Sequence, residues 1–331
     1  MALKLTILCL CVCGVYNLKL EKALIFSRHN IREPVTDNNL KEIVDIWPAS
    51  TYTGQLTPKG ANLEKHMGEY IGNWLKTKKL VPNCPSDDSV YIYANTLQRT
   101  TETAKAFVDG AFPNCDVKVH SIDPDQMDPV FNTSYRNTPP QTKNLVAEEM
   151  ENNLNKLDLK GAYVELDKLL DISDASICQE HRICSFANSS DKICYEIGKE
   201  PELIGPLKYG NEIVDAYLMA YYEGFAMESV GDFENLERLL GEISRASLNV
   251  FSHSPYLARL AAKVLLDYIC DELLSDTKLV LMVGHDTNIQ SLVDALDIEE
   301  FTLPDQVEKT PIGGIWHNHE NTVALGARRG R

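Results

Sequence analysis

The chain has 331 residues, of which 44% are hydrophobic and 24% charged, so it can bury one large core or two modest ones and is not a disordered chain. Its 48 Asp and Glu residues outnumber its 32 Lys and Arg residues, which gives a formal charge of -16. This charge repels nucleic acid and anionic membrane surfaces, and we expect neither as a partner. If the substrate is itself an anion, a compact cluster of cationic side chains must reverse the field at the site.

The first 17 residues have the pattern of a signal peptide. Lys4 precedes an apolar run over residues 5–15, which is too short to span a bilayer. A buried first strand is the alternative interpretation. A signal peptide implies export, so we expect a periplasmic or secreted protein.

The cysteine content also suits an exported protein. Three of the nine cysteines lie in the predicted signal peptide, and the remaining six are Cys84, Cys115, Cys178, Cys184, Cys194 and Cys270. This even number permits disulfides. We expect one between Cys84 and Cys115, which lie in two Pro-containing loops, and one between Cys178 and Cys184, which flank a short polar loop. The chain has no Cys-x-x-Cys pair, and we predict no metal site.

Strand and helix patterns alternate along the first part of the chain. Apolar stretches that end in polar residues are typical of buried strands, and they occupy residues 23–27, 90–94 and 278–283. Residues 62–75 place their apolar side chains on one helical face, and residues 100–107 also suit a helix. This alternation predicts an α/β fold with a mainly parallel central sheet and flanking helices.

The pattern changes between about residues 126 and 275, where we predict helices without convincing strands. These helices occupy residues 146–170, 211–225, 236–250 and 256–274. The sequence therefore predicts an all-helical domain over residues 126–275, inserted into a discontinuous α/β domain made of residues 18–125 and 276–331.

Charged residues follow all three predicted strands. The first strand leads into Arg28, His29 and Arg32, the second leads to Arg99 at a helix start, and the third leads to His285 and Asp286. Each motif alone is commonplace: Arg-His dipeptides are usually incidental, and a His-Asp step is often a helix cap. Because the carboxyl ends of parallel strands share one edge of the sheet, we expect the three motifs to meet there.

This cluster has the chemistry of a phosphate site. Three guanidinium groups can each donate paired hydrogen bonds to a tetrahedral phosphate. His29 among them could attack phosphorus, and the arginines would stabilise the charge on the equatorial oxygens during transfer. Asp286 would hold its proton longer beside a phosphate and could donate it to the departing alkoxide. Such a reaction needs no metal and no other cofactor.

The motif Arg28-His29-x-x-Arg32-x-Pro34, with a distant His285-Asp286, resembles the histidine acid phosphatase family, which is a branch of the histidine phosphatases. The resemblance extends over residues 20–314 and is strongest in the glucose-1-phosphatase branch. It is carried by residues 27–30, 93–100, 110–113, 127–129, 205–208, 221–225 and 310–314.

The resemblance implies roles for the clustered residues. His29 would be the nucleophile and Asp286 the proton donor, and the phosphate ligands would be Arg28, Arg32, Arg99 and His285. The helical insertion would be a cap domain over the α/β domain. The activity implied is that of an acid phosphomonoesterase acting on small sugar phosphates of the glucose 1-phosphate type through a phosphohistidine. The alternatives are a phytase-type inositol phosphate phosphatase, an inactive homologue that only binds phosphate, and a mutase of the same superfamily.

Three further features bear on the substrate and the fold. The resemblance places Glu200 where a cap glutamate reaches the substrate, although a solvated loop carboxylate is the alternative. Asn30 stands where most of the wider family has glycine, which favours the glucose-1-phosphatase branch, whereas the Asp286-Thr287-Asn288 sequence is shared with phytases. Residues 315–331 do not match the family, whose members continue with further strands, so we expect missing C-terminal strands and a bare sheet edge. The sequence predicts no particular oligomeric state.

Overall fold

The computed structural model describes residues 20–298 and 323–325, with gaps at 37–39, 42, 45, 49–50, 52, 226–232 and 253. Within these residues a five-stranded sheet has the order β3-β2-β6-β1-β7. The strands are β1 (Ala23–Arg28), β2 (Val90–Ala94), β3 (Val119–His120), β6 (Leu279–Gly284) and β7 (Val323–Leu325). Strands β3, β2, β6 and β1 are parallel to their neighbours, and β7 is antiparallel to β1. The predicted signal peptide lies outside the described residues.

The central strand β6 shows why this sequence forms a two-faced sheet. All six of its residues are buried. Leu279, Leu281 and Val283 pack into the hydrophobic core on one face, whereas Val280 and Met282 pack into the core on the other. Because successive side chains of a strand point to opposite faces, an uninterrupted apolar run is what a strand covered on both sides requires.

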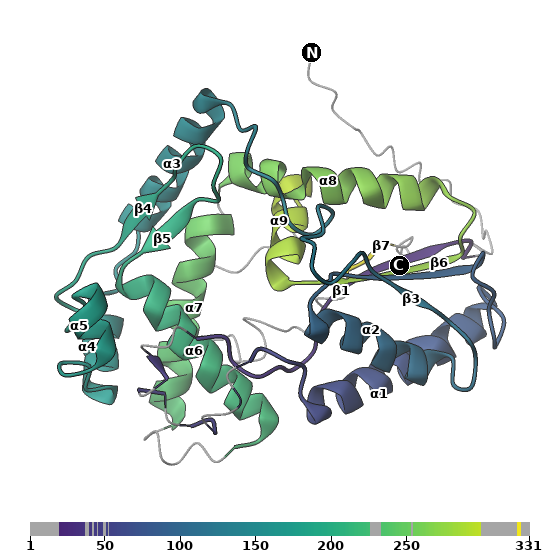
Figure 1. Ribbon diagram of the computed structural model, residues 1–331, viewed down its shortest axis with the longest axis horizontal. Coiled ribbons are helices and arrows are strands. Elements are labelled where there is room, and N and C mark those ends of the chain that lie inside the picture. Colours follow the sequence, from purple (N-terminus) through teal and green to yellow (C-terminus); the bar gives the residue numbers. More distant parts are fainter. Residues whose placement is uncertain are drawn as a thin grey trace, which may run out of the picture.

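Helices cover both faces of the sheet (Figure 1). Helices α1 (Pro58–Lys78) and α2 (Gln98–Ala111) lie on one face, and α8 (Pro255–Leu274) and α9 (Asp286–Leu296) lie on the other. Glycines allow α1 and α2 to approach closely: a Cβ atom on Gly68 would lie 2.2 Å from the carbonyl oxygen of Phe107, and one on Gly110 would lie 1.9 Å from that of Lys65. This tight contact fixes the two helices that flank the strand-end residues of β1 and β2.

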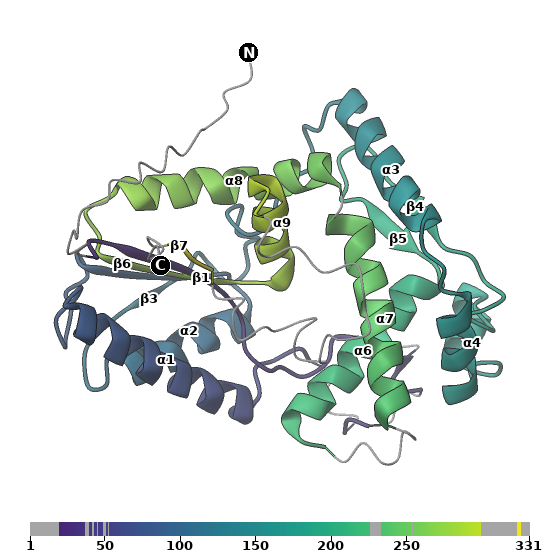
Figure 2. The ribbon, with the colours of Figure 1, turned by 180° about the vertical axis from the view of Figure 1, so that it is seen from behind.

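A second group of elements, between β3 and α8, lies beside the sheet and has its own hydrophobic core (Figure 2). It consists of α3 (Pro140–Asn155), α4 (Lys160–Leu169), α5 (Ser176–His181), β4 (Lys192–Cys194), β5 (Glu202–Ile204), α6 (Pro206–Glu223) and α7 (Phe233–Ser252). Antiparallel β4 and β5 correct the expectation of an all-helical insertion. With three residues each, these strands are too short for an alternating pattern to reveal them.

Two expectations about the inserted helices also differ from the structure. The helix expected over residues 146–170 is divided into α3 and α4, and both Leu157 and Leu159 pack against the same core. Residues two apart point about 200° apart on a helix, so a continuous helix would expose one of them. Helix α8 was expected in the insertion, but Ala262 and Leu265 pack against the sheet with Phe26 of β1. The bounds of the two domains stay a prediction.

Both predicted disulfides are confirmed. Cys84 is bonded to Cys115 with their Cα atoms 5.3 Å apart, and Cys178 is bonded to Cys184 with their Cα atoms 4.3 Å apart. The other two cysteines in the described part of the chain, Cys194 and Cys270, are not disulfide-bonded.

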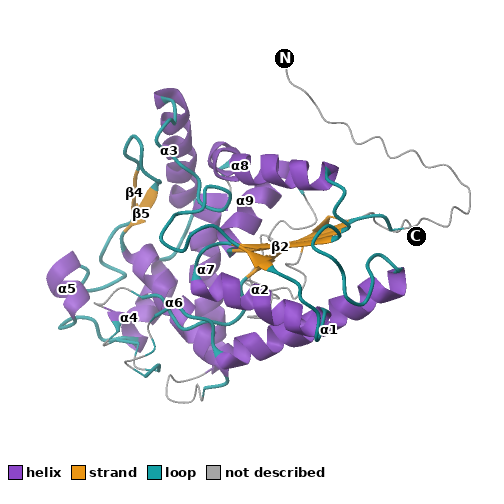
Figure 3. Ribbon diagram, turned by 45° about the vertical axis from the view of Figure 1, so that its right-hand side comes forward, coloured by secondary structure: helices purple, strands orange, loops and turns teal. Residues whose placement is uncertain are grey.

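The edge of the sheet beyond β1 is not bare, contrary to our expectation. Strand β7, from the region that we expected to lie outside the family, pairs antiparallel with residues 24–26 of β1. Figure 3 shows the strands together with the helices that surround them. None of the helices in the described ranges is long and apolar enough to cross a membrane.

Candidate active site

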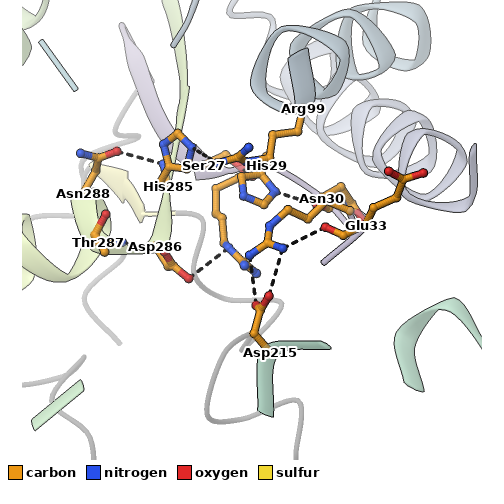
Figure 4. Close-up of polar contacts among 12 residues, drawn as sticks. Ser27, His29, Asn30, Glu33, Arg99, Asp215, His285, Asp286, Thr287 and Asn288 are labelled. Carbon is orange, nitrogen blue, oxygen red and sulfur yellow. Dashed lines mark hydrogen bonds and ion pairs between the residues drawn. The ribbon is translucent and has the colours of Figure 1, made fainter. Parts of the chain in front are cut away.

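The carboxyl ends of β1, β2 and β6 lie side by side, as the sequence predicts. In the register of the sheet Arg28 is opposite Gly284, and Ala94 is opposite Val283. The backbone N–H of His29, just beyond β1, donates to the carbonyl of Gly284 over 3.1 Å. Parallel pairing therefore brings the residues that follow all three strands to one edge (Figure 4).

Arg28 and Asp286 form an ion pair at this edge. The Nε atom of Arg28 lies 3.3 Å from Oδ2 of Asp286, and the arginine side chain is 7% exposed. Asp286 is the first residue of α9, and its Oδ1 accepts the N–H of Thr287 over 2.9 Å. Burial alone would raise the pKa of Asp286, but Arg28, His285 and Arg32 together with this N–H lower it below its ordinary value.

Arg32 is held by a carboxylate that sequence reasoning missed. One terminal nitrogen of Arg32 donates to Oδ1 of Asp215 on α6 over 3.1 Å, and the other lies 3.0 Å from Oδ2, so the two side chains form an ion pair. Both side chains are nearly buried. The one signal in the sequence was a single acidic residue within the apolar helical stretch from Ile213 to Ala220, whose seven other residues are all buried.

Arg99 contacts His285 across the site. A terminal nitrogen of Arg99 lies 3.2 Å from Nε2 of His285, and the other lies 3.4 Å from the Gly54 carbonyl. Because the guanidinium group only donates, this contact favours the uncharged form of the His285 ring. Burial, Arg99, Arg28 and Arg32 lower the pKa of His285 to about 4 against the opposing effect of Asp286. The side-chain amide of Asn95 lies 3.3 Å from its Nδ1.

His29 is the most buried titratable residue of the cluster, with 3% of its surface exposed. Its Nδ1 lies 2.8 Å from the carbonyl oxygen of Asn30. A carbonyl only accepts, so Nδ1 carries the proton and Nε2 carries the lone pair. Burial first, and then Arg28, Arg32 and His285, lowers the pKa of His29 well below its ordinary value of 6.5. The ring is therefore neutral in mildly acidic solution and keeps the lone pair that a nucleophile requires.

Glu200 is the predicted site residue that the structure does not bring to the cluster. It lies in the turn between β4 and β5, and burial and Glu202 raise its pKa. Its charge acts on the nearby Tyr135. In the described part of the chain, Glu200 makes no hydrogen bond or ion pair with the strand-end residues.

Some arginine N–H donors of the cluster have no partner among the described residues and could bind an anion. The Nε atoms of Arg32 and Arg99 are buried and make no hydrogen bond to any described residue. The cluster thus combines three guanidinium groups, a neutral histidine that has a lone pair and a carboxyl group at the start of α9. The fold and this arrangement are those of an enzyme that acts on phosphate esters.

Comparisons with known proteins agree with this class. The profile of the histidine phosphatase superfamily (branch 2) matches residues 16–328, and the chain belongs to that superfamily. Glucose-1-phosphatase from Salmonella typhimurium is 37% identical over 320 residues, which cover 91% of this chain and 78% of that protein. Glucose-1-phosphatase from Providencia rettgeri is 36% identical over 314 residues, which cover 90% and 75%.

A solved structure shares the fold. Phytase from Citrobacter braakii superposes with a TM-score of 0.74 at 28% identity, over 88% of this chain and 79% of that one. The predicted family and fold class are confirmed. The chain is a phosphoric monoester hydrolase of the acid phosphatase type.

Proposed function

We propose that this enzyme hydrolyses small sugar phosphates of the glucose 1-phosphate type, with His29 as nucleophile and Asp286 as proton donor. The observation that carries the proposal is the neutral, buried ring of His29 beside the guanidinium groups of Arg28 and Arg32. Its Nδ1 is committed to the Asn30 carbonyl, so the lone pair is confined to Nε2. This is the protonation state that attack on phosphorus requires.

The proposed reaction has two displacements. Nε2 of His29 attacks phosphorus while the bond from phosphorus to the ester oxygen breaks, and the departing oxygen takes the proton of the Asp286 carboxyl to leave as the alcohol. Water then attacks the phosphohistidine, its proton passes to Asp286, and the bond between nitrogen and phosphorus breaks to release inorganic phosphate. Arg28, Arg32 and Arg99 stabilise the charge on the equatorial oxygens in both steps.

Asp286 must be protonated before the first step. We infer that substrate binding raises its pKa and so keeps the proton on the carboxyl group. Arg28 and His285 lower its pKa in the protein alone. A phosphate group that pairs with Arg28 takes over this cation and adds negative charge beside the carboxyl. Both changes raise the pKa of Asp286, which favours the protonated acid in mildly acidic solution.

The choice of glucose 1-phosphate rests on the similarity to two glucose-1-phosphatases. The role of Glu200 as a contact for the sugar rests on the sequence resemblance alone. Inositol phosphates are the second candidate, because a phytase shares the fold over most of the chain. We also propose that the enzyme is exported, since its two disulfides are typical of oxidising compartments and residues 1–17 have the pattern of a signal peptide.

The decisive test is trapping of the phosphoenzyme. Wild-type enzyme, His29→Ala and the control His66→Ala, whose ring is exposed on α1, are mixed with ³²P-labelled substrate and quenched in alkaline detergent, which preserves phosphohistidine. We expect labelled protein and turnover in the wild type and the control, and neither in His29→Ala. Turnover or label in His29→Ala would refute the nucleophile. Stoichiometric phosphate binding without turnover in the wild type would identify an inactive phosphate-binding protein.

The substrate is tested by steady-state rates on glucose 1-phosphate, phytate and p-nitrophenyl phosphate near pH 5. We expect kcat/KM to be higher for glucose 1-phosphate than for phytate. A higher value for phytate would select the phytase-type alternative. The same assays with EDTA should give unchanged rates, because no step of the proposed reaction uses a metal.

A further inference from the structure

A buried carboxyl group on α1 lies beside the residue that orients His29. Glu64 is 6% exposed, and its Oε2 accepts a hydrogen bond of 2.8 Å from the side-chain amide of Asn30. Burial raises the pKa of Glu64 to about 7, and the hydrogen bond from Asn30 opposes this. A carboxyl group is costly to bury, and an apolar residue at this position would pack against the neighbouring helix at no such cost.

Asn30 is bonded through all four of its polar groups. Its N–H donates to Oγ1 of Thr103 over 3.1 Å, and its Oδ1 accepts the N–H of Ile31 over 2.8 Å. Its amide donates to Glu64, and its carbonyl accepts Nδ1–H of His29. The position of that carbonyl, and hence the direction of the His29 ring, depends on the other three bonds.

The bonds of Asn30 connect the elements that carry the cluster. Oγ1 of Thr103 donates in turn to the carbonyl of Arg99 at 2.7 Å, in the first turn of α2. On the other side, α1 approaches the loop after β1 at Gly60, where a Cβ atom would lie 2.3 Å from the carbonyl oxygen of Ile31. This approach places Glu64, one turn further along α1, within reach of Asn30.

We propose that Glu64 is a positioning residue for the nucleophile: it holds the Asn30 amide, and through the Asn30 carbonyl it fixes the ring of His29 with Nε2 directed toward phosphorus. This inference rests on the proposed function, in which His29 attacks the substrate.

The test compares three variants of α1. Glu64→Leu removes the acceptor at similar volume, Glu64→Gln keeps a carbonyl that can accept from Asn30, and Glu69→Leu changes an exposed glutamate of the same helix. We expect Glu64→Leu to slow phosphoenzyme formation in a single turnover by up to about 100-fold, because small misplacements of a reacting group cost about this much. The affinity for inorganic phosphate should stay nearly constant, Glu64→Gln should restore most of the rate, and Glu69→Leu should match the wild type.

Two readouts separate positioning from general destabilisation. If Glu64 acts through Asn30, Glu64→Leu causes little further loss in an Asn30→Ala background, whereas additive losses overturn the proposal. Selective ¹⁵N labelling of histidine reports the tautomer of His29 without any turnover, and we expect the single Nδ1–H form of the wild type to become a mixture in Glu64→Leu and in Asn30→Ala. An unchanged tautomer and an unchanged single-turnover rate would refute the proposal.

Failure of this inference can be distinguished from failure of the proposed function. If His29→Ala keeps its activity, the nucleophile is wrong whatever Glu64 does. If His29→Ala is inactive and Glu64→Leu is not impaired, the positioning role alone fails. If Glu64→Leu does not fold, Asn30→Ala with the tautomer measurement carries the same test, because it breaks the same connection from the other side.

Discussion

Replacing Asp286 by asparagine tests the proton donor directly. Asparagine has the same shape, so the start of α9 and its bond to the Thr287 N–H are kept. The group that lies 3.3 Å from Nε of Arg28 loses its charge and its transferable proton. The variant should therefore still bind phosphate, but the departing oxygen of an ester must leave as an alkoxide.

The size of the effect depends on the leaving group. One negative charge about 4 Å from Asp286 changes its ionisation energy by about 4 kcal/mol at an effective dielectric constant of 20, which raises its pKa by about three. A bound phosphate can thus keep this carboxyl protonated, and general acid catalysis contributes about 10²- to 10⁴-fold. We expect this loss in kcat/KM with glucose 1-phosphate and less than about tenfold with p-nitrophenyl phosphate, whose phenolate leaves without a proton.

The assay must report the first displacement. The value of kcat can be limited by hydrolysis of the phosphohistidine, which is common to all substrates, whereas kcat/KM reports the steps up to release of the alcohol. The informative quantity is the ratio of kcat/KM between the two substrates in wild type and Asp286→Asn. Equal losses with both substrates would refute the acid role of Asp286, and an unchanged rate with glucose 1-phosphate would remove the residue from the mechanism.

Two further substitutions test the neighbours of the nucleophile. Asp215→Ala leaves Arg32 without its carboxylate, so we expect a loss of about 3 kcal/mol in the free energy of unfolding and a lower kcat/KM; an unchanged urea midpoint would contradict this. The folded-state pKa of His285 is about 4, below the unfolded value of 6.5. Between these two pH values only the unfolded chain takes up the proton. The free energy of unfolding therefore decreases as the pH falls through this range. Going from pH 7 to 4.5, His285→Asn should lose about 2 to 3 kcal/mol less stability than the wild type in urea unfolding, and equal losses would contradict the assignment.

The sequence predicted the strands better than the ends of the helices. The second strand was placed over residues 90–94, and β2 has these bounds. Such strands are buried on both faces, so an apolar run with polar ends defines them. Helix α1 was expected from residue 62 and begins at Pro58, because Thr57 accepts the N–H of Gly60 and proline suits the first turn. The Thr-Pro step carried this signal, but the apolar pattern that we followed begins one turn later.

The cationic residues of the site were predictable, but their partners were not. Arg28, Arg32 and Arg99 follow strands, and parallel pairing alone determines that strand ends meet. Asp215 lies 183 positions from Arg32 in the chain, on a helix outside the sheet. Its contact depends on how α6 packs beside the strand ends, which no local pattern encodes. Glu64 is similar, because burial of a carboxyl follows from the tight packing of α1 against α2.

The contacts of the arginines explain how a protein with a net negative charge can bind phosphate. Arg28 and Arg32 each contact a carboxylate, so a phosphate gains only the difference between the new ion pair and the existing one. Arg99 differs, since among the described residues its hydrogen-bond partners are the uncharged His285 and the carbonyl of Gly54. Burial, Arg32 and Arg28 lower its pKa to about 10 against the opposing effects of Asp215 and Asp286, so a phosphate would stabilise the charge of this arginine. Recognition of phosphate by an acidic protein then depends on short-range exchange of ion pairs at one edge of the sheet, and little on attraction at a distance.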